Sequence, residues 1–144
     1  MDTKTMWEQY ASSNDICAEY DAWSFGDDAN TLADLVLNGR KTATASAYPL
    51  YELEGETLPS EGQYSVVLWE DGSAACIIKT TKVYIVPFCQ VSGEQAYREG
   101  EGDRSLTYWQ KVHRAFFKRE MEDVGLAFTE DMKVVCEEFI RVFP

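Results

Sequence analysis

The chain has 144 residues and a formal net charge of −12 at pH 7, with 45% hydrophobic and 26% charged residues. This length and composition indicate one globular domain over residues 1–144 and exclude a disordered chain. The negative charge, without any run of Lys and Arg, excludes duplex DNA as a partner, because duplex binding needs a basic surface. The four cysteines lack zinc-site spacing, and no apolar run of about 18 residues or signal segment is present. We therefore expect a cytoplasmic protein with reduced thiols and no membrane partner.

The N-terminal part of the chain, about residues 1–38, is predicted to be helical. Residues 6–20 form a weakly patterned helix, and residues 28–38 form a sharper one with an apolar stripe at helical spacing. Asp27 or Asp28 is suited to cap the start of the second helix. Gly39 is suited to its C-terminal cap, because glycine adopts positive φ without strain.

The middle of the chain is predicted to be β-structure. Residues 42–47 form a probable strand, and residues 48–62 are predicted to be a long surface loop because they contain two prolines and two glycines. Strands are expected over residues 64–69 and 75–86. The dipeptide Asp71-Gly72 between them is a strong hairpin signal.

The C-terminal third mixes helix and strand. We predict a short helix over residues 92–99, a glycine-broken acidic loop over residues 99–103, a helix over residues 106–121 capped by Asp103 or Ser105, and a closing strand over residues 132–143. The predicted strands and helices do not alternate as repeated β-α-β units. The pattern favours an α+β fold with an antiparallel sheet, either open or closed into a barrel.

The segment from Gly39 to Ser46 is the first candidate for chemistry. Lys41 and Thr44 are three residues apart at a turn between a helix and a strand, so both can face one pocket if Lys41 lies in the turn. A buried lysine can take a proton from a threonine hydroxyl, and the activated oxygen can attack a carbonyl. The alternative is structural, namely a helix cap followed by a strand with a solvated lysine.

A second candidate lies in the loop after the short helix. Glu99, Glu101 and Asp103 place three carboxylates within five residues, where they can position a substrate, bind a cation or transfer protons. The structural alternative is an exposed loop whose last acid caps the next helix.

Aromatic residues and the single histidine form the remaining candidates. Trp109 and His113 share a helical face, where His113 is either a hydrogen-bonded core residue or part of a pocket wall. Trp23 and Phe25 precede a helix and either stack on a base or anchor the core. One histidine excludes a histidine-rich metal site.

Taken together, these segments resemble the ASCH-domain family, in its longer bacterial branch. The resemblance extends from about Trp23 to Phe139. It is most specific because the chain contains both a Gly-x-Lys-x-x-Thr motif and a Glu-Gly-Glu-Gly-Asp loop. It is carried by the segments Trp23-Ser24-Phe25-Gly26, Leu35 to Ser46, Pro87-Phe88 with Val91, and Glu99 to Asp103 with Trp109 and His113. The resemblance implies a PUA-like, mostly antiparallel β-barrel with flanking helices.

The resemblance also implies an activity. One branch of the family hydrolyses the amide of N4-acetylcytidine and related acylated cytosines with a lysine, a threonine and a glutamate. These match Lys41, Thr44 and Glu99, with Glu101 as the second choice for the glutamate. That branch has an arginine two residues after the threonine, whereas this chain has Ser46, so the guanidinium that would orient the substrate or recognise an anion is missing here.

The leading hypothesis is therefore an amide hydrolase for an acylated nucleoside or base, needing neither a metal nor an organic cofactor. Lys41, Thr44 and Glu99 are the predicted catalytic residues. The predicted substrate-binding residues are Trp23, Phe25, Gly39, Arg40, Ser46, Glu101, Asp103, Trp109 and His113.

Two other classes of function, and a homodimer as the assembly, stay open. One is binding or processing of a short RNA, including metal-dependent cleavage by Glu99, Glu101 and Asp103. The other is non-catalytic binding of a nucleotide-like ligand. RNA binding needs a positive groove, for which the candidates form two sets: Arg40, Lys41, Lys79 and Lys82, and Lys111, Arg114, Lys118 and Arg119.

Overall fold

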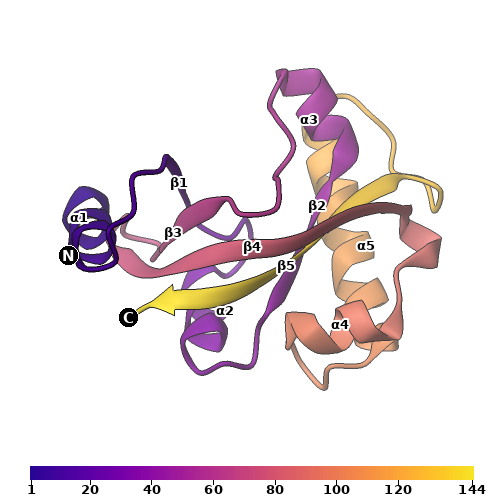
Figure 1. Ribbon diagram of the computed structural model, residues 1–144. Coiled ribbons are helices and arrows are strands. Elements are labelled where there is room, and N and C mark those ends of the chain that lie inside the picture. The colour runs from indigo at the N-terminus through magenta and orange to yellow at the C-terminus, as the bar shows by residue number, and fades with distance from the viewer.

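A computed structural model describes all residues, 1–144. Helices and strands alternate irregularly along the chain (Figure 1). In chain order they are α1 (Thr3–Ser13), β1 (Tyr20–Trp23), α2 (Ala29–Leu37), β2 (Ala43–Ala47), α3 (Tyr48–Glu54), β3 (Tyr64–Leu68), β4 (Ala74–Pro87), a 3-10 turn (Phe88–Gln90), α4 (Gly93–Glu99), α5 (Leu106–Asp123) and β5 (Lys133–Phe143). The α+β class predicted from the sequence is confirmed.

The strands form one open five-stranded sheet in the order β1-β3-β4-β5-β2. All neighbours are antiparallel except β1 and β3, which are parallel. The prediction of a closed barrel was wrong. The edge strands β1 and β2 are only 4 and 5 residues long and are separated by three other strands, so they do not pair with each other.

The N-terminal region departs from the prediction of a helix over residues 6–20. The helix α1 begins earlier, because Asp2 accepts a hydrogen bond from the backbone N–H of Thr5, and it ends at Ser13. The chain then enters the sheet as β1, which the sequence did not reveal. A strand of four residues is too short for an alternating pattern, and its parallel partner β3 lies far along the chain.

The predicted loop over residues 48–62 was wrong in its first half, which is the helix α3. Pro49 lies in the first turn, where a missing N–H breaks no intrahelical hydrogen bond. Gly55 ends the helix in the left-handed conformation, with φ +66°. The proline that suggested a loop is therefore a helix start.

The helices α4 and α5 are close to their predicted ranges. Ser92 and Ser105 cap them by accepting backbone N–H hydrogen bonds, so Ser105 rather than Asp103 caps α5. The buried face of α5 consists of residues four apart, namely Trp109, His113, Phe117 and Met121. Three residues of this stripe, Trp109, Phe117 and Met121, pack with Phe88 and the β5 residues Val134 and Cys136 in one core cluster.

The long strands β4 and β5 extend across the molecule (Figure 1). Both termini lie at one end of these strands with α1, and α4 and α5 lie at the other end. None of the helices combines the length and apolar character needed to cross a bilayer. The turn after α2, the start of β2, the end of α4 and the side of α5 converge, and this convergence positions the site.

Candidate functional site

Lys41 lies in the turn between α2 and β2. Gly39 adopts φ +81°, and the N–H groups of Arg40 and Lys41 both donate to the carbonyl of Leu35, so the chain reverses tightly after the helix. The Lys41 side chain points inward and is only 2% exposed. A long cationic side chain with so little exposure requires anionic partners, because burying an isolated charge is strongly unfavourable.

Two carboxylates provide those partners. The ammonium nitrogen Nζ of Lys41 lies 3.2 Å from Oε2 of Glu101 and 3.7 Å from Oε1 of Glu99, and it donates to the backbone carbonyl of Glu99 at 3.4 Å. It also lies 5.2 Å from the centre of the Phe25 ring, which is a cation–π distance. Lys41 thus binds the end of α4 and the following loop to the turn after α2.

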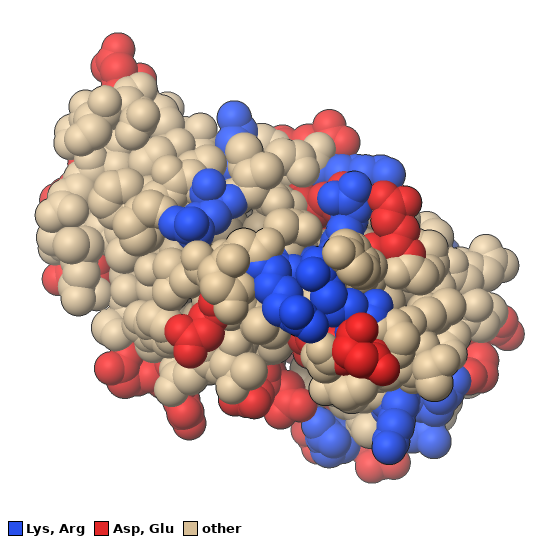
Figure 2. All heavy atoms as spheres, turned by 90° about the horizontal axis from the view of Figure 1, so that it is seen from below, with Lys and Arg blue, Asp and Glu red and all other residues tan.

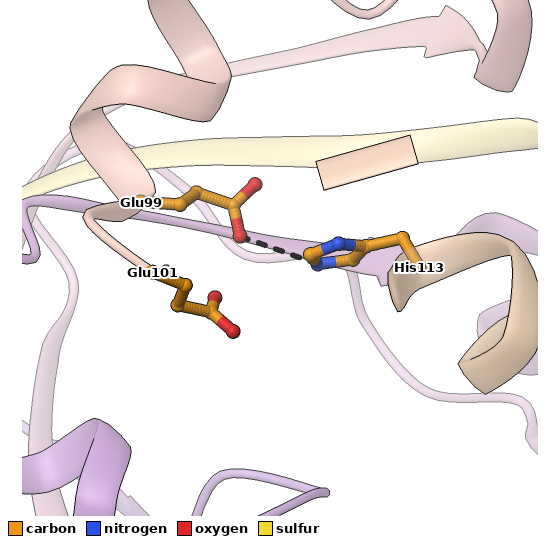
Figure 3. Close-up of side chains that lie close together, drawn as sticks. All are labelled: Glu99, Glu101 and His113. Atoms are coloured by element: carbon orange, nitrogen blue, oxygen red, sulfur yellow. Dashed lines mark ion pairs between the residues drawn. The ribbon is translucent and has the colours of Figure 1, made fainter. Parts of the chain in front are cut away.

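Glu99 is the most enclosed charged group of the site, at 1% exposure. Its Oε2 accepts hydrogen bonds from the indole N–H of Trp109 at 2.6 Å and from Nε2 of Gln95 at 3.1 Å. Its Oε1 lies 3.4 Å from Nε2 of His113 (Figure 3). Burial alone would raise the pKa of Glu99, but the charge of Lys41 and the hydrogen bonds from His113 and Trp109 lower it overall.

His113 is held in one orientation. Its ring stacks on the Trp109 indole with centroids 4.1 Å apart and an interplanar angle of 13°, and its Nδ1 donates to the Trp109 carbonyl at 3.0 Å. Burial would lower its pKa, but the contacts with Glu99 raise it overall. Glu99 contributes stability that is lost as pH falls below about 4.5, and His113 contributes stability that is lost as pH rises above about 6.5, so the pair stabilises the fold most between these values.

Gln95 is a member of the site that the sequence reasoning missed. It is 1% exposed, and its Nε2 donates both to Glu99 and to the backbone carbonyl of Thr44, while its Oε1 accepts from the Tyr84 hydroxyl. It therefore connects the catalytic candidates Glu99 and Thr44 through one side chain. The signal was present in the sequence, since Gln95 and Glu99 are four apart on a predicted helix.

Two arginines hold the acidic loop in place. Arg40 donates from Nε to the carbonyl of Gly100 at 2.7 Å and from its terminal nitrogen to the carbonyl of Gly102 at 2.8 Å. Arg104 donates to the carbonyls of Tyr97 and Arg40. These hydrogen bonds fix the loop so that the Glu101 carboxylate faces the same space as Glu99 (Figure 3).

A cavity of about 210 Å³ opens at this point. Six of the residues predicted for the site from the sequence fall on its wall: Phe25, Lys41, Thr44, Glu99, Glu101 and His113. The structure therefore brings the Gly-x-Lys-x-x-Thr segment and the acidic loop to one enclosed space. Trp23 and Ser46 lie instead on the wall of a neighbouring hollow.

The other predicted binding residues lie outside both walls. Trp109 is buried behind Glu99, and Arg40 braces the acidic loop. Asp103 is exposed and accepts the Ser105 N–H, and Gly39 is exposed in its turn. These four residues shape and support the cavity without lining it.

The sequence model of the ASCH-domain family matches residues 21–143 of this chain. The chain belongs to the ASCH-domain family. The crystal structure of an ASCH domain from Lactobacillus crispatus JV V101 is 40% identical, covering 98% of this chain and 94% of that chain with a TM-score of 0.88. A crystal structure of a protein from Enterococcus faecalis V583 is 38% identical, covering 97% and 87%, with a TM-score of 0.90.

A crystal structure of a hypothetical protein is only 17% identical to this chain, with a TM-score of 0.59. The match covers 86% of this chain and 100% of that chain, and it shows a shared fold alone. The sequence matches no curated protein. The resemblance read from the motifs is thereby confirmed, and the fold of this ASCH domain matches the PUA-like structures with its sheet open.

Three residues of this ASCH domain could contribute metal ligands: Glu99, Glu101 and His113, whose ligand atoms lie within 4.8 Å of one another. The set differs from the predicted trio, because Asp103 points elsewhere and His113 replaces it. The Lys41 ammonium contacts both carboxylates of the set. The two acids therefore already have a cationic partner within the chain.

Glu137 of β5 has an unusually high pKa for a glutamate. Burial raises its pKa to about 7, and no ion pair offsets that burial. The folded state therefore keeps this proton to higher pH than the unfolded chain does, and stability falls as pH rises from about 4.5 to about 7.

We expect Glu137→Gln to raise the free energy of unfolding by about 2–3 kcal/mol at pH 8 and to change it little at pH 4.5. Urea unfolding at both pH values measures the effect. Glu122→Gln, an exposed position in the last turn of α5, is the control and should be neutral at both. An equal effect of Glu137→Gln at the two pH values would contradict the assignment.

Proposed function

We propose that this ASCH domain is a small amide hydrolase that acts on an acylated nucleoside or base, such as N4-acetylcytidine. The observation that carries the proposal is the buried pairing of Lys41 with Glu99, at 3.7 Å, on the wall of a cavity that Thr44 also lines. An acid and a base beside a hydroxyl nucleophile are the groups that acyl transfer needs.

The proposed reaction begins with a proton shift inside the buried pair. Lys41 passes a proton to Glu99, giving a neutral amine and a carboxylic acid; because the pKa of Glu99 is lowered in the folded protein, this transfer is uphill and the neutral pair forms only transiently. The amine then accepts the Thr44 proton while the hydroxyl oxygen adds to the acyl carbonyl. The C–N bond breaks, the Glu99 acid protonates the leaving exocyclic nitrogen, and an acyl ester on Thr44 remains.

The second half repeats the same exchange with water. After another proton shift to Glu99, the Lys41 amine accepts a proton from water as the oxygen adds to the ester. The C–O bond to Thr44 breaks, and Glu99 returns the proton to the threonine oxygen. Carboxylic acid leaves, and the ion pair is restored. In the free protein the hydrogen bonds of Nζ go to Glu99 and Glu101 rather than to Thr44, so substrate entry accompanies a local rearrangement of Lys41.

The test is release of cytidine from N4-acetylcytidine, followed by chromatography. Thr44→Ala should reduce kcat by at least about 10³-fold, because the nucleophile is lost. Thr42→Ala is the matched control: its hydroxyl lies two residues earlier, donates to the Arg98 carbonyl, and is absent from the cavity wall. It should retain kcat within a few-fold. An acetyl adduct on Thr44 in quenched reactions would support the covalent step, and turnover by Thr44→Ala equal to the parent would exclude it.

Binding of a short RNA is a second candidate, because the PUA-like fold of ASCH domains is often proposed to bind RNA. Lys and Arg side chains gather near the middle of one face (Figure 2). Arg104 donates to the backbone carbonyl of Arg40, and Arg98 and Lys82 share the partner Glu138. Lys41 does not contribute to this face, since it is buried. RNA binding predicts an affinity that falls steeply with salt, and an affinity independent of salt would count against it.

A further inference from the structure

A second and larger hollow, of about 380 Å³, adjoins the cavity that holds Lys41 and Glu99. The two spaces share the wall residues Phe25, Gly26, Thr44, Ala45 and Phe116. Thr44, the proposed nucleophile, therefore lies at the boundary between them. A substrate whose acyl carbonyl reaches Thr44 from the first cavity has room for its remaining part in the second.

The walls of this hollow are suited to a flat organic group. Trp23 and Phe25 lie on one side in an edge-to-face arrangement with ring centroids 5.0 Å apart. Leu50 and Tyr51 of α3 line it from the segment that the sequence suggested to be a loop. The Tyr51 hydroxyl is hydrogen bonded to Ser46 at 2.8 Å, which fixes its ring against β2.

The charge in this hollow has one sign. Its wall contains carboxylates from Asp21, Glu54, Glu56, Glu120 and Glu137, and no Lys or Arg. Glu137 is the carboxylate closest to the proposed chemistry, because it lies directly opposite Thr44 in the β2–β5 register, which places both side chains on the same face of the sheet. Burial, followed by the charges of Glu54 and Asp123, also raises the pKa of Glu120.

We propose that this second hollow is a substrate subsite for a phosphate-free group that carries N–H donors or a positive charge, and that Glu137 recognises that group. The proposal rests on the proposed function, since it places the subsite next to the Thr44 hydroxyl. It deepens that function by adding a selection against phosphate: unphosphorylated nucleosides, bases or acylated amines enter, and their phosphorylated forms are repelled by the surrounding carboxylates.

The first experiment compares N4-acetylcytidine with its 5′-monophosphate at about pH 8, above the pKa of about 7 that burial gives Glu137, so that this carboxylate is ionised. The parent should have a kcat/KM at least about 30-fold higher for the nucleoside, since a phosphate next to like charges in an enclosed space is disfavoured. Glu137→Gln should lower kcat/KM for the nucleoside and raise it for the monophosphate, so that the preference shrinks about tenfold or more. Glu122→Gln, outside the hollow, should keep the parental preference. Equal use of both substrates by the parent would overturn the proposal.

The second experiment tests binding to the subsite independently of any hydrolysis. Equilibrium binding of cytidine and of cytidine 5′-monophosphate is measured by calorimetry for the parent and for Glu137→Gln, neither ligand having an amide to cleave. A parental preference for cytidine that Glu137→Gln removes supports the subsite, even if no acylated compound is turned over. Binding of neither ligand, equal binding of both, or a preference unchanged in Glu137→Gln overturns the subsite, whether or not the parent hydrolyses N4-acetylcytidine.

Discussion

Replacing Lys41 by methionine should lower the free energy of unfolding by about 3–5 kcal/mol at pH 7, because it leaves the buried carboxylate of Glu99 without its main cationic partner. Methionine keeps most of the side-chain volume, so the loss reports the charge rather than a cavity. Lys4→Met is the control, since Lys4 is exposed and pairs with Glu8 at 3.9 Å on the surface; it should change stability by less than about 0.5 kcal/mol. Denaturant unfolding measures both.

A double-mutant cycle tests whether the pair acts as a unit. Adding Glu99→Gln to Lys41→Met removes the unpaired charge, so the double variant should recover at least about 2 kcal/mol of the loss. Strict additivity of the two single effects would mean that the ion pair does not account for the stability of this region. Activity is expected to be absent in all three variants, so stability and catalysis are measured separately.

Gly100→Ala should destabilise the protein by several kcal/mol and impair the site at the same time. Gly100 has φ +74°, and a Cβ there would overlap the backbone carbonyl of Arg40, whose carbon would lie 2.7 Å away. The backbone cannot yield, because Arg40 donates to the carbonyls of Gly100 and Gly102 and accepts from Arg104. The acidic loop would move away from the turn after α2, and the Lys41–Glu101 contact would lengthen.

Gly39→Ala provides the matched control for this prediction. Gly39 also has positive φ, at +81°, but no atom lies within 4 Å of the added Cβ. Gly39→Ala should lower the free energy of unfolding by about 1–2 kcal/mol, which is the cost of holding alanine in the left-handed conformation without any steric overlap. The difference between the two variants in denaturant unfolding therefore isolates the steric overlap with Arg40. Equal losses would show that the loop adapts and that its contact with the turn is not rigid.

Elements with a local signal were predictable. The stripe of residues four apart on α5, the long strand β4 with its β-branched residues and the Asp71-Gly72 turn are set by neighbours in the chain, and the structure confirms them. The strand β1 was missed because its partner β3 is distant in sequence. The helix α3 was missed because Pro49, which usually breaks helices, lies at the one position where it is tolerated.

In the site, too, some features follow from the local sequence and others depend on contacts between distant segments. The sequence by itself determined the candidates Lys41, Thr44 and Glu99, the glycines that let the two turns form, and the family that the chain belongs to. Only the tertiary structure decided that Lys41 is buried between two carboxylates 58 and 60 residues away, that Gln95 joins Glu99 to Thr44, and that Glu137 faces an acidic hollow opposite Thr44. Turns and caps depend on local backbone energies, whereas burial and the pairing of charges exist only once distant segments have packed together.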